Sequence, residues 1–375
     1  MMAHEFKLLR RIQKERSGIV LSEDKIDLVE AKLRPLLKEF GFPSFAHLTL
    51  ALMKPNAERL RARVAQSIAV LETYFFRDKA PFNYFADVML PRLMEARKGS
   101  RRIRIWCAAS STGQEPYSLA MILADAGQRL EGWTVDIVAT DFVEDALLKA
   151  KKGVYTQFDV QRGLPVAKLV QYFQQVGNGW QIKPEIRSKV TFREHNLLDD
   201  CQGLGIFDVI FCRNVLIYFD EQLKSAVLGR LAGQLASDGY LVLGAAETTS
   251  GVSPDFTRLS TGPRGIFCMT PLAAAHAETA LQRRLAKAAR TAVPADCEHA
   301  DSGDQSLIAE WESHGSPAKQ TDVSVPLDRQ TADLLAAIAK ARGISVAELL
   351  AEMAASEPPA PEDMPYHPFK TVGRA

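Results

Sequence analysis

Short apolar runs alternate with helix-like segments between residues 102 and 269 of this 375-residue chain. Each run has the length and β-branched content of a strand, and each following segment has apolar residues at helical spacing. Strands joined by helices run parallel, because each helix returns the chain to the same end of the sheet. The alternation therefore predicts a parallel, doubly wound α/β sheet. The expected strands are 102–107, 133–141, 189–196, 207–215 and 239–247, with short strands at 256–260 and 265–269, and the helices between them are 116–128, 143–153 and 220–237.

One segment interrupts this alternation. Residues 154–189 contain a helix-like stretch at 165–175 and a Gly-Asn-Gly turn before Trp180. Such a turn between short extended runs is typical of a β hairpin. We therefore expect a small inserted β subdomain here.

Residues 1–75 predict a small helical domain. Ser22 is the expected N-cap of a helix that ends at Gly41, and Asn56 is the expected N-cap of a helix that continues to Phe76. Two of these helices carry basic residues, which suit an acidic partner, although such a run is more often a solvated face. The basic residues are Lys25, Lys32, Arg34, Lys38, Arg59, Arg61 and Arg63.

The C-terminal part differs in composition. Residues 271–322 are Ala-rich and then acidic, which predicts a linker, and 358–375 predict a disordered tail. Between them, 323–357 predict a strand and two helices, and residues 320–357 weakly resemble a ribbon-helix-helix module. Its strand carries no cation to face DNA, so nucleic-acid binding is not expected. A unit this small buries little surface alone, and we expect it to self-associate or to dock on the body.

Several classes of protein are not expected. The five cysteines lack CxxC spacing, which favours reduced thiols in a cytoplasmic protein. The histidines show no paired spacing, so no metal site is predicted. No apolar run approaches the roughly 20 residues of a membrane span, and the N-terminus does not resemble a signal peptide.

The loop after the first strand of the sheet points to a ligand. In an open α/β sheet, ligands lie at the carboxyl ends of the strands. Gly113 lets the backbone approach a ligand closely, but the loop lacks the G-x-G-x-x-G pattern of a dinucleotide site. Glu115 stands where a diphosphate would need a bare helix N-terminus. A carboxylate there favours a cationic ligand without phosphate, such as S-adenosylmethionine.

The next strand ends support this site. Asp141 ends the second strand and suits the hydroxyls of a ribose. Helix capping is the alternative role for both acids. Arg213 and Asn214 follow the fourth strand, where a substrate would meet the cofactor, and Tyr218 comes one turn later. The Asn-Pro-Pro-aromatic pattern of base methyltransferases is absent, so a base amino group is not the expected substrate.

From about residue 5 to 270 the chain resembles the CheR family, the chemotaxis receptor glutamate methyltransferases. The resemblance implies a Rossmann-like methyltransferase domain at 76–270, preceded by a helical domain, interrupted by a small β subdomain and followed here by a C-terminal extension. It also implies methylation of glutamate side chains on the cytoplasmic helices of chemoreceptors. The motifs that carry it are LETYFFRD, WCAASSTGQEPYSLAM, ATDF, EHNLLD, FDVIFCRNVLIYFD and DGYLVLGAAET.

The resemblance also implies site residues. We expect Arg77 and Tyr218 to orient the substrate carboxylate and the methyl donor. Leu71 stands where the family often has Asn, and the loop 174–184 is short, as in members that do not bind a receptor's C-terminal pentapeptide. The implied cofactor contacts are Thr73, Arg77, Glu115, Asp141, Asn196, Leu197, Arg213 and Asn214.

The expected chemistry needs few groups. A glutamate side chain has a pKa of about 4.3 and is already a nucleophile at neutral pH, so no general base is required. Two alternatives remain open: a methyltransferase of the same fold that acts on another chemosensory partner or a small molecule, and a cofactor-sensing adaptor without turnover.

Overall fold

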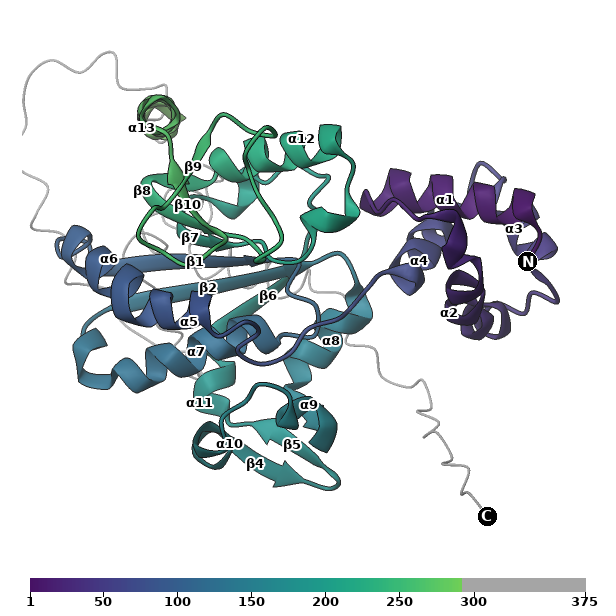
Figure 1. The fold of residues 1–375 in the computed structure, drawn as a ribbon, viewed down its shortest axis with the longest axis horizontal. Coiled ribbons are helices and arrows are strands. Elements are labelled where there is room, and N and C mark those ends of the chain that lie inside the picture. The colour runs from purple at the N-terminus through teal and green to yellow at the C-terminus, as the bar shows by residue number, and fades with distance from the viewer. Residues whose placement is uncertain (292–375) are drawn as a thin grey trace, which may run out of the picture. The chain divides into compact units, whose positions relative to one another are not determined.

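The computed structural model describes residues 1–291, in which a helical domain precedes an α/β domain that carries a small β subdomain (Figure 1). The predicted strand-helix-helix segment at 323–357 and the predicted tail lie outside the described residues. None of the helices in residues 1–291 is long and apolar enough to cross a membrane. The helical domain consists of α1 (Ala3–Ser17), the 3-10 turn η1 (Glu23–Lys25), α2 (Ile26–Glu39), α3 (Phe45–Leu52) and α4 (Glu58–Ile68).

The helical domain packs around one apolar core. Leu9, Leu33, Leu48 and Val64 come from its four α-helices and are fully buried. The helices themselves form, but the expected cap Ser22 lacks its side-chain bond and the expected cap Asn56 is displaced by one residue. Ser22 precedes a 3-10 turn and makes no capping bond, and α4 begins after Ala57 rather than after Asn56.

Helix α4 also ends earlier than expected, at Ile68 instead of Phe76. The ammonium group of Lys32 donates to the carbonyls of Ile68 and Ala69, at 2.9 and 2.5 Å. It thus provides a hydrogen-bond donor for two carbonyls at the end of α4. Ala69 then adopts an extended conformation, with ψ of 150°. The chain therefore leaves the helix here and continues as an irregular segment, residues 69–77, into the α/β domain.

Several cations of the expected basic face have partners inside the chain. Lys32 is half-buried, Arg34 pairs with Glu30, and Arg63 pairs with Asp145. Lys38 and Arg59 are exposed. The expected docking face is therefore smaller than the sequence indicates, and Lys32 belongs to the structure of the domain.

The α/β domain contains a seven-stranded sheet in the order β6-β2-β1-β7-β8-β10-β9. The first five strands are parallel, but β10 runs antiparallel to both β8 and β9. The sheet is mixed rather than purely parallel, because no helix separates β8, β9 and β10. The strands are β1 (Arg102–Ala108), β2 (Thr134–Asp141), β6 (Val190–Glu194), β7 (Phe207–Phe211), β8 (Leu235–Val242), β9 (Phe256–Arg258) and β10 (Ile266–Met269).

Helices cover both faces of this sheet, α6 and α7 on one and α12 on the other (Figure 1). Alternate residues of β1 serve the two cores: Ile105 packs on the side of α7, and Trp106 on the side of α12. The helices are α5 (Ala80–Tyr84), the π-helical turn η2 (Phe85–Met89), α6 (Leu90–Ala96), α7 (Gln114–Ala126), η3 (Gly127–Leu130), α8 (Glu144–Lys152), η4 (Gln202–Leu204), η5 (Leu216–Tyr218), α12 (Glu221–Ala232) and α13 (Pro271–Thr291).

Two boundaries near the end of the domain differ from expectation. Helix α12 stops at Ala232, and β8 begins already at Leu235, which pairs with Phe207 of β7. Strand pairing thus overrides a helical pattern that continues to residue 237. The beginning of the expected linker is also helical, since α13 packs with buried Ala273 against the α12 side of the sheet.

The inserted subdomain is confirmed as a three-stranded antiparallel sheet in the order β3-β5-β4. The turn before Trp180 joins β4 to β5, as predicted. The expected helix ends at Tyr172 instead of residue 175, because the following residues pair with β5. The elements are β3 (Val154–Thr156), α9 (Gln157–Gln161), α10 (Val166–Tyr172), β4 (Phe173–Val176), β5 (Gly179–Ile182) and α11 (Pro184–Arg187).

We predict that Lys32→Met destabilises the chain. The variant removes the donor for two carbonyls at the end of α4, and each unmet carbonyl costs on the order of 1 kcal/mol. Thermal unfolding should therefore begin at a lower temperature than in the wild type. Lys38→Met, an exposed position on the same helix, is the matched control. Equal melting temperatures for the two variants would contradict a structural role for Lys32.

Candidate functional site

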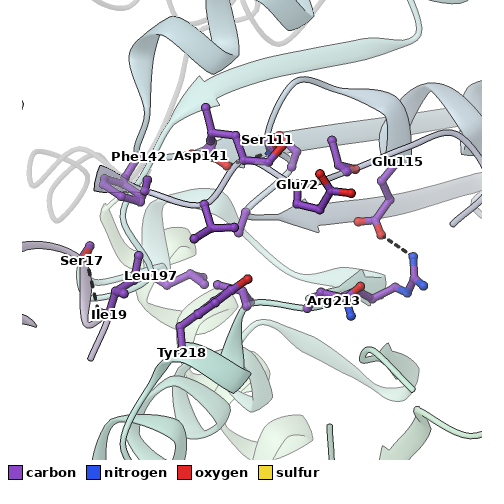
Figure 2. Close-up of a pocket in the computed structure, with 18 of the residues that line it drawn as sticks. Ser17, Ile19, Glu72, Ser111, Glu115, Asp141, Phe142, Leu197, Arg213 and Tyr218 are labelled. Atoms are coloured by element: carbon purple, nitrogen blue, oxygen red, sulfur yellow. Dashed lines mark hydrogen bonds and ion pairs between the residues drawn. The ribbon is translucent and has the colours of Figure 1, made fainter. Parts of the chain in front are cut away.

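A pocket lies at the carboxyl ends of β1, β2, β6 and β7, where open α/β sheets bind ligands. Its walls also include residues 69–73, among them the predicted Thr73, and the end of α1, which was not predicted as a pocket wall. Figure 2 shows Glu115 and Arg213 at one end, Ser111 and Asp141 along one wall, and Tyr218 along the opposite wall. The pocket thus joins the helical domain to the sheet.

Nearly all residues predicted for the site line this pocket. Gly113 is the exception: it precedes α7 as its N-cap residue, with φ of 91°, and a Cβ atom there would lie 2.8 Å from Cβ of Ala150. Its lack of a side chain therefore permits close packing of the loop on α8 rather than contact with a ligand. The predicted residues that line the pocket are Thr73, Arg77, Glu115, Asp141, Asn196, Leu197, Arg213, Asn214 and Tyr218.

Asp141 is buried at the end of β2. Its carboxylate accepts the backbone N–H of Ser111 at 2.8 Å and that of Val143 at 2.9 Å. Burial raises the pKa of Asp141, and these N–H groups oppose the rise. An ionised carboxylate can accept about four hydrogen bonds, so two remain for a ligand's hydroxyl groups. The bond to Val143 also supports the start of α8, so the predicted capping role and the ligand role are compatible.

Arg213 forms a buried network at the other end of the pocket. Its guanidinium lies 3.0 Å from the carboxylate of Glu115 and 2.7 Å from that of Asp78, and it donates to the carbonyl of Arg77 at 2.9 Å. Burial raises the pKa of Glu115, and the charge of Arg213 opposes this. The network joins the loop after β7 to α7 and to the segment that follows residue 72.

Glu247 supports the loop after β7 and was not predicted as a site residue. Its buried carboxylate accepts four backbone N–H groups, those of Asn214 at 2.8 Å, Val215 at 3.0 Å, Ile217 at 3.3 Å and Gly244 at 2.6 Å. Asn214 itself has a φ of 58°, a conformation that costs energy for a residue with a side chain. Glu247 therefore fixes the loop that carries the predicted residues Arg213, Asn214 and Tyr218. The sequence contained it within the motif DGYLVLGAAET, but nothing local marked its role.

Other strained residues also gather near the pocket. Backbone strain persists only where surrounding contacts hold it, and it is typical of functional sites. The residues with positive φ that are not glycine and lie in the segments around the pocket are Phe76, Asp78, Lys79, Ala109, Ser111 and Asn214.

Residues 69–73 and Arg77 form one wall, and tertiary contacts hold their segment in a non-helical conformation. The hydroxyl of Ser111 donates to the carbonyl of Leu71 at 3.0 Å. This bond holds the backbone in place at Leu71, the residue that stands where the family often has Asn. Arg77 donates to the carbonyl of Glu72 at 2.8 Å. Thr73 lines the pocket on the same segment.

Asn196 has a structural role in addition to its predicted one. Its side-chain amide donates to the carbonyl of Arg16 at 2.6 Å, and its oxygen accepts the N–H of Leu198 at 3.1 Å. These bonds hold the end of α1 at the pocket, where Ser17 and Ile19 contribute to the wall. No local pattern in the sequence indicated this contribution of the helical domain.

The pocket residues fit S-adenosylmethionine. Three residues that line it each have a buried polar atom without a partner within the described chain: the hydroxyl of Ser110, Nε of Arg213 and Oδ1 of Asn214. Buried polar groups without partners are costly, so such atoms indicate a polar ligand. Two carboxylates suit a cationic group and a ribose, and Ile19 and Phe142 provide apolar surface. Within residues 1–291, no three His, Cys, Asp or Glu side chains gather as metal ligands would.

Comparison with known proteins supports this assignment. Residues 71–264 match the family described as CheR methyltransferase, SAM binding domain, and residues 4–65 match the CheR methyltransferase all-alpha domain. The chain is 40% identical over 269 residues to chemotaxis protein methyltransferase 1 of Pseudomonas aeruginosa, covering 70% of this chain and 97% of that one. It is 38% identical over 266 residues to the chemotaxis protein methyltransferase of Vibrio parahaemolyticus, covering 70% and 96%.

We predict that Asp141→Asn weakens S-adenosylmethionine binding. Each charge-assisted hydrogen bond to a ribose hydroxyl contributes about 1.5–3 kcal/mol, so the loss corresponds to roughly a tenfold to hundredfold change in Kd. Calorimetric titration of the folded variant measures it. Asp136→Asn, the same substitution at the other end of β2, should bind like the wild type, since Asp136 pairs with Arg102 outside the pocket.

The same carboxylate predicts a pH dependence. Because burial raises the pKa of Asp141, protonation begins above the ordinary carboxyl range near pH 4, and the affinity that requires the ionised form is lost as the pH falls through the raised value. The affinity of the wild type for S-adenosylmethionine should therefore fall on acidification. The affinity of Asp141→Asn, which has no carboxyl group to protonate at this position, should fall less. Wild-type affinity in the folded Asp141→Asn variant at neutral pH would refute the ribose site.

Proposed function

Because the chain belongs to the CheR family of S-adenosylmethionine-dependent chemotaxis methyltransferases, we propose that it converts glutamate side chains of chemoreceptors to methyl esters. The observation that carries this proposal is the pocket itself, in which two buried carboxylates, Glu115 and Asp141, stand together with Arg77 and Tyr218. The carboxylates suit the cofactor, and Arg77 suits an acidic side chain of a protein substrate.

The proposed cofactor contacts come from polar side chains that line the pocket. When bound, S-adenosylmethionine supplies an electrophilic methyl group on a sulfonium sulfur. Glu115 would attract the cationic end of the cofactor, and Asp141 would accept the ribose hydroxyls. Ser110 and Asn214 offer a hydroxyl and an amide oxygen that lack hydrogen-bond partners within residues 1–291. Thr73, Asn196 and Leu197 complete the proposed contacts.

The substrate glutamate needs orientation rather than activation. Its carboxylate is ionised at neutral pH and is itself the nucleophile, so positioning supplies most of the catalysis. Arg77 donates one N–H to the carbonyl of Glu72 and can offer others to the substrate. This contact must stay moderate, because the negative charge of the carboxylate is lost as the ester forms. Tyr218 lines the opposite wall and would help to orient the two reactants.

We propose that the partner is the helical cytoplasmic region of the chemoreceptors, so the chain would act in the cytoplasm. The short β4–β5 connection supports recognition without a receptor C-terminal pentapeptide. If so, removing the last residues of a receptor leaves its KM unchanged. The alternative of a cofactor-sensing adaptor without turnover is less favoured, because Arg77 and Tyr218 remain beside the two carboxylates.

The test is methyl transfer from labelled S-adenosylmethionine to membranes that contain chemoreceptors. We expect base-labile label on wild-type receptors and none on receptors whose methylated glutamates are replaced by Gln. Arg77→Met should reduce kcat about tenfold or more, because an orienting contact is lost. Arg92→Met, an exposed position on α6, is the control. Tight binding of the cofactor by the wild type without any transfer would instead favour the adaptor.

We also propose that the predicted segment 323–357 mediates self-association and that methyl transfer does not require it. A chain that ends after Thr291 keeps α13, which packs on the sheet, and every residue of the proposed site. We expect this shortened chain to retain receptor methylation and to sediment as a monomer at concentrations where the full chain associates. Identical sedimentation behaviour of the two chains would contradict the association, and lost activity would contradict the dispensable role.

A further inference from the structure

An alternating series of aromatic rings and guanidinium groups leads from the inserted subdomain to the pocket. The guanidinium carbon of Arg162 lies 5.8 Å from the ring centre of Phe158 and 4.7 Å from that of Tyr74. The guanidinium carbon of Arg77 lies 5.6 Å from the centre of the Tyr74 ring as well. Tyr74 therefore contacts two cations, of which Arg77 lines the pocket and Arg162 is not among the residues that line it. We call Phe158, Arg162, Tyr74 and Arg77 the arginine–aromatic series.

The position of Arg162 relative to the pocket is fixed by close packing. The next residue, Gly163, has a φ of 76°, and a Cβ atom there would lie 2.0 Å from the carbonyl oxygen of Phe75. Phe75 is fully buried, and its ring packs edge-on against Tyr155 at 5.0 Å and Phe173 at 5.6 Å. The backbones of the subdomain and of the pocket wall are thus in direct contact. The backbone at Arg162 is therefore held close to the pocket wall.

Arg162 is paired with a carboxylate of the chain itself, and a carboxylate of the substrate could take its place. Arg162 pairs with Glu72 at 2.6 Å, and their side chains are 36% and 54% exposed. Exposed ion pairs contribute little to stability, so exchange of one carboxylate for another changes the free energy little. Glu72 itself lines the pocket, as does Glu115, and both are labelled in Figure 2. A carboxylate that replaces Glu72 at Arg162 would therefore stand at the mouth of the site.

The exposed end of the series suits a protein rather than a small molecule. Phe158 is 66% exposed, although it is a large apolar side chain. An apolar ring beside a guanidinium matches the side of an amphipathic helix that carries an acidic residue. On such a helix, residues three or four positions apart lie on one face. A glutamate held near Arg77 would then place a second acid of the same face outside the pocket.

We infer that Arg162, held between Phe158 and Tyr74, binds an acidic residue that flanks the target glutamate on the substrate helix, displacing Glu72. This inference rests on the proposed function and names the substrate feature that the same site selects. Arg77 receives the glutamate that becomes methylated, and Arg162 selects helices with a second carboxylate about one turn away. Glu72 occupies Arg162 when no substrate is bound.

The experiment measures KM for receptor, kcat and cofactor Kd for the full-length chain, with chemoreceptor membranes and labelled S-adenosylmethionine. Arg162→Ala should raise KM roughly tenfold and leave cofactor Kd unchanged, because a ground-state contact to substrate is lost. Arg162→Lys should restore part of this loss, since it keeps the charge but not the planar stacking group. Phe158→Ala should raise KM by a smaller factor. Arg129→Ala, an exposed arginine on η3, is the control.

A substitution in the receptor provides a second measurement. Replacing the flanking acid of a receptor methylation helix by Gln should raise KM for the wild type and have no further effect on Arg162→Ala. Unchanged KM for Arg162→Ala, or independent effects of the two substitutions, would overturn the inference while leaving receptor methylation intact. Absence of transfer by the wild type to any receptor would instead overturn the proposed function, and with it this inference.

Discussion

The buried guanidinium of Arg213 determines the geometry of the pocket. It contacts a carboxylate from α7, a carboxylate from the segment before α5 and a backbone carbonyl of that segment. A buried cation is stable only when such partners surround it, so the three elements must come together as a unit. Within residues 1–291, Nε of Arg213 is buried without a hydrogen-bond partner, so one donor of this unit is not used by the described part of the chain.

The sequence predicted the parts of the fold and site that depend on local pattern. Alternating strands and helices gave the α/β domain, and Asp141 and Glu115 were found because they follow strands. The resemblance indicated Thr73 and Arg77 as site residues, but the non-helical conformation of residues 69–77 could not be predicted, since the apolar pattern continues that of α4. Contacts from distant residues, Lys32, Ser111 and Gly163, hold this segment out of a helix. Strand pairing likewise ended α12 earlier than its pattern indicated.

The inserted subdomain and the pocket wall share one hydrophobic core. Phe75, between the pocket residues Thr73 and Arg77, packs on Tyr155 and Phe173 of the subdomain. A displacement of the subdomain would therefore move the wall as well, because packed cores do not deform smoothly. The subdomain is in this respect a support of the site and more than an attached module. Any ligand that the subdomain holds stands in a fixed relation to the pocket.

The bonds of Glu247 also determine when the site can form. The loop that carries Arg213 and Asn214 has three N–H groups whose shared acceptor, Glu247, lies 30 to 33 residues further along the chain. During synthesis, the strained loop lacks this acceptor until the ribosome has released the segment that follows β8. The sheet edge formed by β6, β2 and β1 can pair before that point. The chain can therefore bind the cofactor only late in its synthesis, and the cofactor stabilises only chains that have folded past residue 247.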